Sequence, residues 1–226
     1  DDDRRRSTMS GLLQKDLCLL KSNRKTLVLF LALAVVISLG QTNTFILGYF
    51  PFLMIIMLTG TISYDEMDNG FPFLFTLPVD RKMYIREKYL LCILGAAGSF
   101  LIALALYFAS LMVNGVADAA GQLLENAGMF PVVLAVFFLA IAVTIPIQVK
   151  YGAEGSRIVL AGICFLGAGV ILFVHKTAGD AALEKITSFS DMLEKTSGKI
   201  GAFAVGIAAL LISYGISVRV MEKKEF

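Results

Sequence analysis

The chain has 226 residues, of which 57% are hydrophobic and 17% are charged. This composition is too apolar for an ordinary soluble domain, so the sequence predicts an integral membrane protein. The formal net charge is only +2, and the charged residues gather between long apolar runs rather than within them. We therefore expect the lipid bilayer, and no nucleic acid, as a partner.

The N-terminal segment combines a charged start with a leucine-rich stretch. Residues 1–8, an acidic triplet followed by three arginines, resemble an expression-tag remnant, and we expect the native chain to begin at Met9. From Met9 onward leucines recur on one helical face, whereas Lys15 and Asp16 face elsewhere. The pattern predicts an amphipathic interfacial helix over about 9–25, either as a membrane anchor or as an elbow that also contacts a soluble partner.

Six apolar runs are long enough for a helix to cross about 30 Å of hydrocarbon. They lie near residues 24–41, 44–64, 89–113, 128–149, 157–175 and 199–220. The first run is the weakest, because its uninterrupted apolar core is short. We therefore predict an all-α integral membrane protein, with six transmembrane helices in a single transmembrane domain over residues 9–226.

Basic residues are divided unequally between the two sides of the predicted membrane. One side carries them in every loop and near both termini, whereas the other carries them only in the loop between the fifth and sixth runs, at Lys176, Lys185, Lys195 and Lys199. Since basic loops stay in the cytoplasm, both termini are predicted to be cytoplasmic. Apolar residues at helical spacing over about 180–199 predict an amphipathic external helix in that last loop.

Several kinds of site are not indicated by the sequence. No Asp, Glu, Lys or Arg lies well inside any of the six runs, although an ion-coupled carrier usually keeps such a residue at mid-membrane. Cys18, Cys92 and Cys164 lack the spacing of a metal site. There is also no G-x-x-x-x-G-K-[ST] phosphate loop. We therefore expect that this chain is not an enzyme and that it binds neither a cofactor nor a metal.

A charged segment over residues 63–88 separates the second and third runs. Acidic residues follow the second run, and Asn69-Gly70 and Phe71-Pro72 then break the helix. Leu77-Pro78 restarts a helix, and basic residues lead into the third run. This order predicts a short cytoplasmic helix between spans 2 and 3, perpendicular to them. The alternative is a solvated loop whose basic residues only obey the positive-inside rule.

These motifs resemble the permease subunits of type-2 ABC exporters. The resemblance is strongest to the small bacterial permeases that export phenol-soluble modulins and other antimicrobial or amphipathic peptides. The matching residues are Glu66, Gly70, Leu77-Pro78-Val79-Asp80-Arg81 and Lys88. A second match runs from Ile145 to Arg157, which is similar to the second cytoplasmic loop of that family, and Lys15-Asp16 fits its N-terminal segment.

The resemblance implies a bacterial plasma-membrane exporter of a hydrophobic or amphipathic substrate, with a peptide favoured. Its implied partners are a second copy of this permease or a homologous permease, and a separate ABC ATPase subunit that uses ATP and Mg. Contact with that ATPase is assigned to two cytoplasmic loops, at Asp65, Glu66, Gly70, Phe73, Leu77, Pro78, Arg81, Lys150, Glu154 and Arg157. The alternatives are an ion-coupled secondary transporter and a non-transporting membrane immunity or scaffold protein.

Overall fold

The computed structural model describes residues 2–40, 44–66, 70–74, 76, 79–115, 118–194 and 196–224. Within these ranges every regular element is an α-helix. In chain order they are α1 (Asp2–Ser22), α2 (Arg24–Gly40), α3 (Phe45–Glu66), α4 (Gly70–Leu74), α5 (Arg81–Val113), α6 (Ala119–Ala127), α7 (Phe130–Glu194) and α8 (Thr196–Lys223). The predicted all-α class is confirmed.

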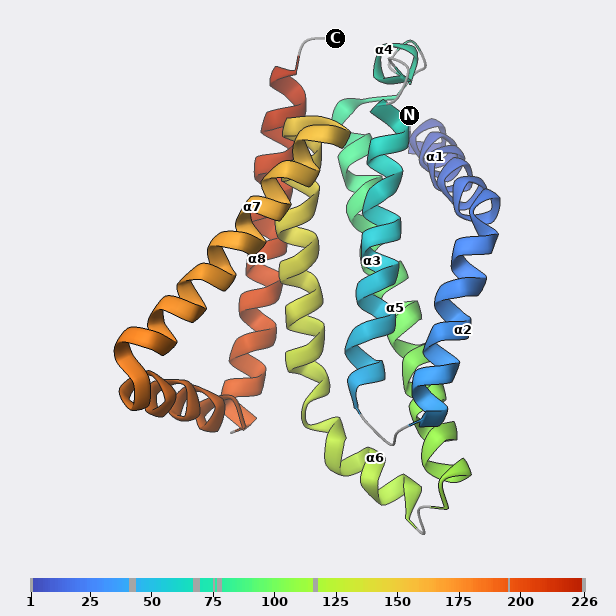
Figure 1. Cartoon of the computed structure of the whole chain (residues 1–226). Coiled ribbons are helices and arrows are strands. Elements are labelled where there is room, and N and C mark those ends of the chain that lie inside the picture. Colours follow the sequence, from blue (N-terminus) through green and yellow to red (C-terminus); the bar gives the residue numbers. More distant parts are fainter. Residues whose placement is uncertain are drawn as a thin grey trace.

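The long helices run side by side between two ends of the molecule (Figure 1). α2 descends from the upper end, α3 returns, and α5 descends again. α7 rises, reverses direction, descends and crosses the lower end, and α8 then rises to the C-terminus. Both termini lie at the upper end, where α1 lies obliquely and α4 sits above α3 and α5, whereas α6 lies at the lower end.

Four helical segments are long and apolar enough to cross a membrane. They are Phe45–Glu66, Arg81–Val113, Phe130–Gly152 and Ser197–Lys223, all within the part of the chain that the structure describes. They correspond to the second, third, fourth and sixth predicted runs. α2 coincides with the first run, but its 17 residues are at the lower limit for a crossing. The part of α7 after Gly152 contains the fifth run.

Two boundaries differ from the prediction. α5 begins at Arg81, eight residues before the predicted start at residue 89, because the charged side chains of its first two turns find partners within the fold. α7 carries no loop between the fourth and fifth runs. Instead, Gly152 adopts a left-handed backbone with φ 72°, which a glycine tolerates without steric cost, and the helix direction reverses there (Figure 1). We call residues 130–152 the rising limb of α7 and the following residues its descending limb.

The predicted orientation of the N-terminal helix was partly wrong. Asp16 has no exposed surface and Leu12 is 5% exposed, whereas Leu17 is 57% exposed. Residues four apart share one helix face, so Leu12 and Asp16 point together into the bundle. The predicted external helix over 180–199 falls at the end of α7 and the start of α8; its side chains from 180 to 196 lie outside the described residues.

The core lies between α3, α5, α7 and α8. Small residues let the helices approach closely, as they commonly do in membrane bundles. A Cβ atom added at Gly95 would collide with Leu58 across the α3–α5 contact, and one added at Gly206 would lie 3.1 Å from the Ala135 Cα across the α7–α8 contact. These close approaches join α3 to α5 and α7 to α8 within the bundle.

Candidate functional site

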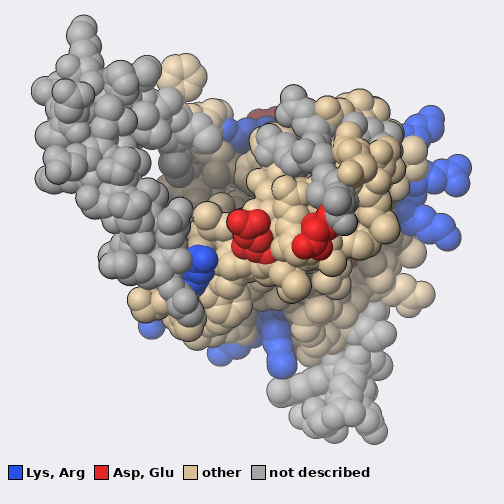
Figure 2. Space-filling view, turned by 90° about the horizontal axis from the view of Figure 1, so that it is seen from below, with Lys and Arg blue, Asp and Glu red and all other residues tan. Residues whose placement is uncertain are grey.

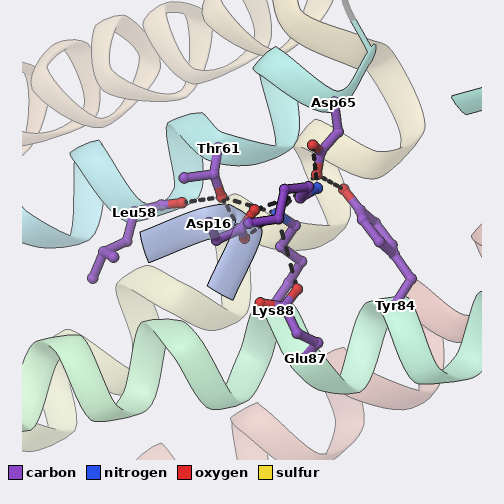
Figure 3. A network of polar contacts seen from close by, with 8 residues as sticks. Asp16, Leu58, Thr61, Asp65, Tyr84, Glu87 and Lys88 are labelled. Atoms are coloured by element: carbon purple, nitrogen blue, oxygen red, sulfur yellow. Dashed lines mark hydrogen bonds and ion pairs between the residues drawn. The ribbon is translucent and has the colours of Figure 1, made fainter. Parts of the chain in front are cut away.

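Lys88 lies at the centre of a cluster of buried charges at the upper end of the bundle (Figure 3). Its Nζ lies 2.8 Å from Asp65 Oδ2 at the end of α3, and it also donates to Asp16 Oδ2 from α1. A further bond of 3.1 Å reaches Thr61 Oγ1. Lys88 and Asp16 have fully buried side chains. Burying such charges is tolerated only when each is paired and hydrogen-bonded.

Two further side chains, those of Lys15 and Tyr84, also bond to Asp65. Lys15 Nζ forms an ion pair with Asp65 Oδ1 and lies 3.3 Å from Asp16 Oδ1. The Tyr84 hydroxyl donates to Asp65 Oδ2 at 2.9 Å. Asp65 therefore accepts from three donors on two helices, α1 and α5. We call Lys15, Asp16, Thr61, Asp65, Tyr84, Glu87 and Lys88 the ion cluster; it fastens α1 to α3 and α5.

Glu87 is the least satisfied member of the ion cluster. Its side chain has no exposed surface, and neither carboxylate oxygen has a hydrogen-bond partner among the described residues. Its ion-pair partner is Lys88, whose Nζ lies 3.9 Å from Glu87 Oε2. No group of three or more His, Cys, Asp or Glu within the described ranges has the geometry of a metal site. The described contacts of the cluster are ion pairs together with hydrogen bonds of Thr61 and Tyr84.

A second set of contacts holds the end of α8. Arg81 at the start of α5 donates to the carbonyl oxygens of Met221, Glu222 and Lys224, at 3.1, 2.8 and 3.0 Å. The last carbonyls of a helix have no partner within the helix and carry a partial negative charge, so a cation stabilises them. Lys224 in turn bonds Glu66 Oε1 at 2.9 Å. We call Glu66, Arg81 and Lys224 the C-terminal clamp.

The reversal of α7 packs against the C-terminal clamp. Lys224 Nζ donates to the Val149 carbonyl at 3.2 Å. A Cβ atom added at Gly152 would collide with the Glu66 carboxylate. Gly152 is therefore required twice, by its positive φ and by this close approach. The ends of α3, α5 and α8 meet the turn of α7 at one place.

α4 sits above these contacts and presents one aromatic ring outward. Phe71 is buried, and its ring meets the Tyr84 ring edge-on at 5.7 Å. A Cβ atom added at Gly70 would collide with the Asp65 carbonyl oxygen, which explains the glycine at the start of α4. Phe73, in contrast, is 72% exposed. α4 lies in the charged segment where a short helix was predicted, but it is formed by Gly70 and Phe71-Pro72, which were expected to break a helix. Leu77 and Pro78, where the restart was predicted, lie outside the described residues.

The remaining predicted residues lie around the turn of α7. Lys150, Glu154 and Arg157 are all exposed, and Arg157 also lines a cavity between α3 and α7. The ten predicted residues thus divide into two groups where they are described. Asp65, Glu66, Gly70 and Arg81 are engaged inside the fold, whereas Phe73 and the three residues near the turn are open to a partner.

Sequence reasoning did not identify the ion cluster as a unit. Asp16 and Lys88 were noticed only as parts of separate motifs, and Thr61, Tyr84 and Glu87 were not singled out. One signal was present, because Asp16 lies four residues after Leu12 and therefore shares a helix face with it. A carboxylate on an apolar face indicates a buried cationic partner. The sequence did not indicate which of the many basic residues that partner would be.

The two ends of the molecule differ in charge. Figure 2 views the lower end, where acidic side chains lie near the centre of the view and most basic side chains project at its margin. Asp118 there caps α6, accepting from the Gly121 backbone N–H at 2.8 Å. Among basic side chains that the structure describes, only Lys199 belongs to this end, where its Nζ approaches Gly128. The basic residues of the ion cluster, the clamp and the α7 turn all lie at the upper end.

These observations define an all-helical, multi-pass membrane protein whose upper end is tied together by ion pairs. The family comparison refines that class. The model of the ABC-2 family transporter proteins matches residues 11–222, and the chain belongs to this family. No curated protein and no solved structure gave a significant match.

Proposed function

We propose that this chain is the permease subunit of an ATP-driven exporter that moves a hydrophobic or amphipathic molecule out of a bacterial cell across the plasma membrane. The family match over residues 11–222 carries the proposal. ATP and Mg would be used by a separate ABC ATPase subunit rather than by this chain, which would act as a transport subunit and not as an enzyme. A peptide remains the predicted cargo.

The proposed topology has six spans with both termini in the cytoplasm. Four segments have the length and composition of spans, and α2 and the descending limb of α7 run alongside them (Figure 1). The described basic side chains concentrate at the upper end, as the positive-inside rule requires of a cytoplasmic face. In this orientation α1 is the interfacial helix on the cytoplasmic side, and α4 and the α7 turn face the ATPase.

We assign the outer contact with the ATPase to Phe73 and to the exposed charges of Lys150 and Glu154. Aromatic anchors that become buried commonly dominate binding energy, while rim charges orient the partners. Asp65, Glu66 and Arg81 act behind this surface, because each is bonded to another helix of the same chain. A push on α4 would therefore move α3, α5 and α8 together. This arrangement supports α4 as a coupling helix.

Two permeases, either two copies of this chain or this chain with a homologous permease, would pair around the substrate pathway. Each would carry one ATPase subunit. The rival functions remain an ion-coupled secondary transporter and an immunity or scaffold protein that binds without transport. ATP-dependent flux in vesicles that contain both subunits separates the exporter from both rivals, because neither rival needs the ATPase.

The contact itself can be tested by truncating one exposed phenylalanine. In F73A, co-purification of the cognate ABC ATPase should weaken by at least about tenfold, the loss expected for an aromatic anchor. F165A is the matched control, because Phe165 is 84% exposed on the descending limb of α7, away from α4. Equal retention of the ATPase by F73A and by the unmodified chain would refute this contact.

A further inference from the structure

A cavity of about 590 Å³ lies between α3 and the two limbs of α7. α3 forms one wall, the rising limb forms a second wall, and the first turns of the descending limb close the upper end. The lining residues that determine its chemistry are Phe52, Thr59, Tyr64, Thr144, Gln148 and Arg157. The volume is that of a small-molecule site.

The lining changes from apolar to polar along the bundle. Tyr64 lies twelve residues after Phe52 on α3, which at 1.5 Å per residue is about 18 Å along the helix. The lower part, around Phe52 and Ala140, is apolar. Tyr64, Gln148 and Arg157 belong to the upper end, next to the α7 turn. The cavity is therefore elongated and amphipathic, with its polar groups at the end that we assign to the cytoplasm.

Gln148 is the clearest sign that the polar end is built for a ligand. The residue is 8% exposed, and its Oε1 is buried without a hydrogen-bond partner among the described residues. A buried, unsatisfied amide oxygen is uncommon in folded proteins, because losing its bonds to water is costly. A hydroxyl or N–H group of a bound molecule would satisfy it.

Arg157 supplies a positive charge at the same end. Its guanidinium is always protonated and can bind a carboxylate or phosphate with two parallel hydrogen bonds. None of the described residues that line the cavity is an Asp or Glu. The polar end therefore favours an anionic group, with a hydrogen-bond donor placed next to it for Gln148.

The apolar part selects against a peptide. An α-helix is about 10–12 Å wide, so the cavity of one chain encloses little more than one helical turn. An extended peptide would bring backbone N–H and C=O groups that need partners. The Thr59 and Thr144 hydroxyls already donate to carbonyls of their own helices, those of Ile55 and Ala140. An alkyl chain needs no such partners.

We infer that the cavity between α3 and α7 is a binding site for a single-chain amphiphile with an anionic head that carries a hydroxyl group, of the lysophospholipid type. Arg157 binds the anion, Gln148 accepts from the hydroxyl, and the chain extends along α3 towards Phe52. Binding is a property of this chain alone.

The absence of tryptophan from the sequence allows a direct optical test. A single tryptophan is introduced in F52W, at the apolar end of the cavity, and the protein is placed in nanodiscs of a zwitterionic phospholipid. The probe is lysophosphatidylglycerol with bromine near the end of its acyl chain, which quenches tryptophan fluorescence at short range. The control L101W places the tryptophan on an exposed part of α5, where Leu101 is 65% exposed, and reports simple partitioning of the probe into the bilayer.

Quenching in F52W should saturate at one probe per chain, whereas quenching in L101W should rise without saturation. Adding R157Q to F52W should weaken apparent affinity about ten- to hundredfold, and adding Q148L about three- to tenfold, as expected for a charged and a neutral hydrogen bond. R219Q, a change at an exposed arginine of α8 that is outside the cavity, should leave affinity unchanged. A brominated monoacylglycerol, which has hydroxyl groups but no phosphate, should bind as weakly to F52W as the anionic probe binds to F52W/R157Q.

Parallel quenching in F52W and L101W, or quenching that R157Q does not weaken, would overturn the inference. The inference would also be overturned if quenching were absent and V143C cross-linked two copies of the chain. That result would assign the cavity to a permease dimer interface. These results need no ATPase. If F52W binds the probe as expected while ATP-driven flux is absent, the proposed function fails and the binding site stands.

Discussion

Lys88 and Asp16 form an ion pair in which neither side chain has any exposed surface. They are 72 positions apart in the sequence, and their contact joins α1 to α5. Loss of one partner leaves the other as an uncompensated charge in a low-dielectric site, which costs more than loss of both. The position of α1 against the bundle therefore depends on this pair.

Removal of either member should destabilise the fold strongly. We expect D16N and K88M each to lower the free energy of unfolding by about 3–5 kcal/mol, the usual cost of breaking a buried ion pair. The D16N/K88M double variant should lose less than the sum of the two single losses, because the residues interact directly. Reversible unfolding in mixed detergent micelles measures all three variants.

The same helix offers a matched control on the surface. Lys82 Nζ lies 3.2 Å from Glu222 Oε1, and their side chains are 69% and 45% exposed. Because exposed pairs contribute little, K82M should change the free energy of unfolding by less than about 1 kcal/mol. If K82M and K88M cost the same, burial does not determine the strength of the cluster.

The reversal of α7 should depend on glycine at position 152. G152A forces a side chain into a left-handed conformation, which costs about 1–2 kcal/mol, and in addition displaces the Glu66 carboxylate. G115A is the control, because Gly115 has φ 70° but no atom within 4 Å of an added Cβ. We expect G152A to be more destabilising than G115A in the same unfolding measurement, and equal effects would show that the Glu66 contact is unimportant.

The C-terminal clamp should control the order of the end of α8. R81Q removes the guanidinium that bonds three carbonyl oxygens at the last turn of that helix. Amide hydrogen exchange in residues 218–224 should therefore accelerate by about tenfold or more, as expected for the loss of at least one charged hydrogen bond. R86Q, at an exposed arginine on the same helix, should leave this segment protected. Unchanged exchange in R81Q would count against the clamp.

The length and pattern of the apolar runs predicted the bounds of α2 and α3 well, because these helices are apolar along almost their whole length. α2 and α3 begin and end within two residues of the predicted runs 24–41 and 44–64. The start of α5 was less predictable, because residues 81–88 are charged and are helical only through their tertiary partners. The reversal within α7 likewise depends on one backbone angle at Gly152 that periodicity does not encode.

The sequence predicted where the charged residues of the site would lie, but not which of them would pair with each other. The charged segment after the second run does lie at the end where α4 and the clamp meet. However, Asp65 was expected at a partner surface and is instead held by Lys15, Tyr84 and Lys88. Pairing between residues on different helices depends on packing in three dimensions, whereas a single sequence indicates only which charges are available. The assignment of Asp65 to the ATPase contact stays a prediction.

A last prediction concerns the hydroxyl groups that join α5 to α8. The Tyr89 hydroxyl bonds Ser213 Oγ at 2.6 Å and Ser217 Oγ at 2.9 Å, and Ser213 also donates to the Ala142 carbonyl on α7. Y89F should cost about 0.6–1.7 kcal/mol in the same unfolding measurement, the range for hydrogen bonds between membrane helices. Y151F, at an exposed ring, should cost less. If Y89F is neutral while S213A is costly, the bond from Ser213 to Ala142 rather than the tyrosine holds these helices together.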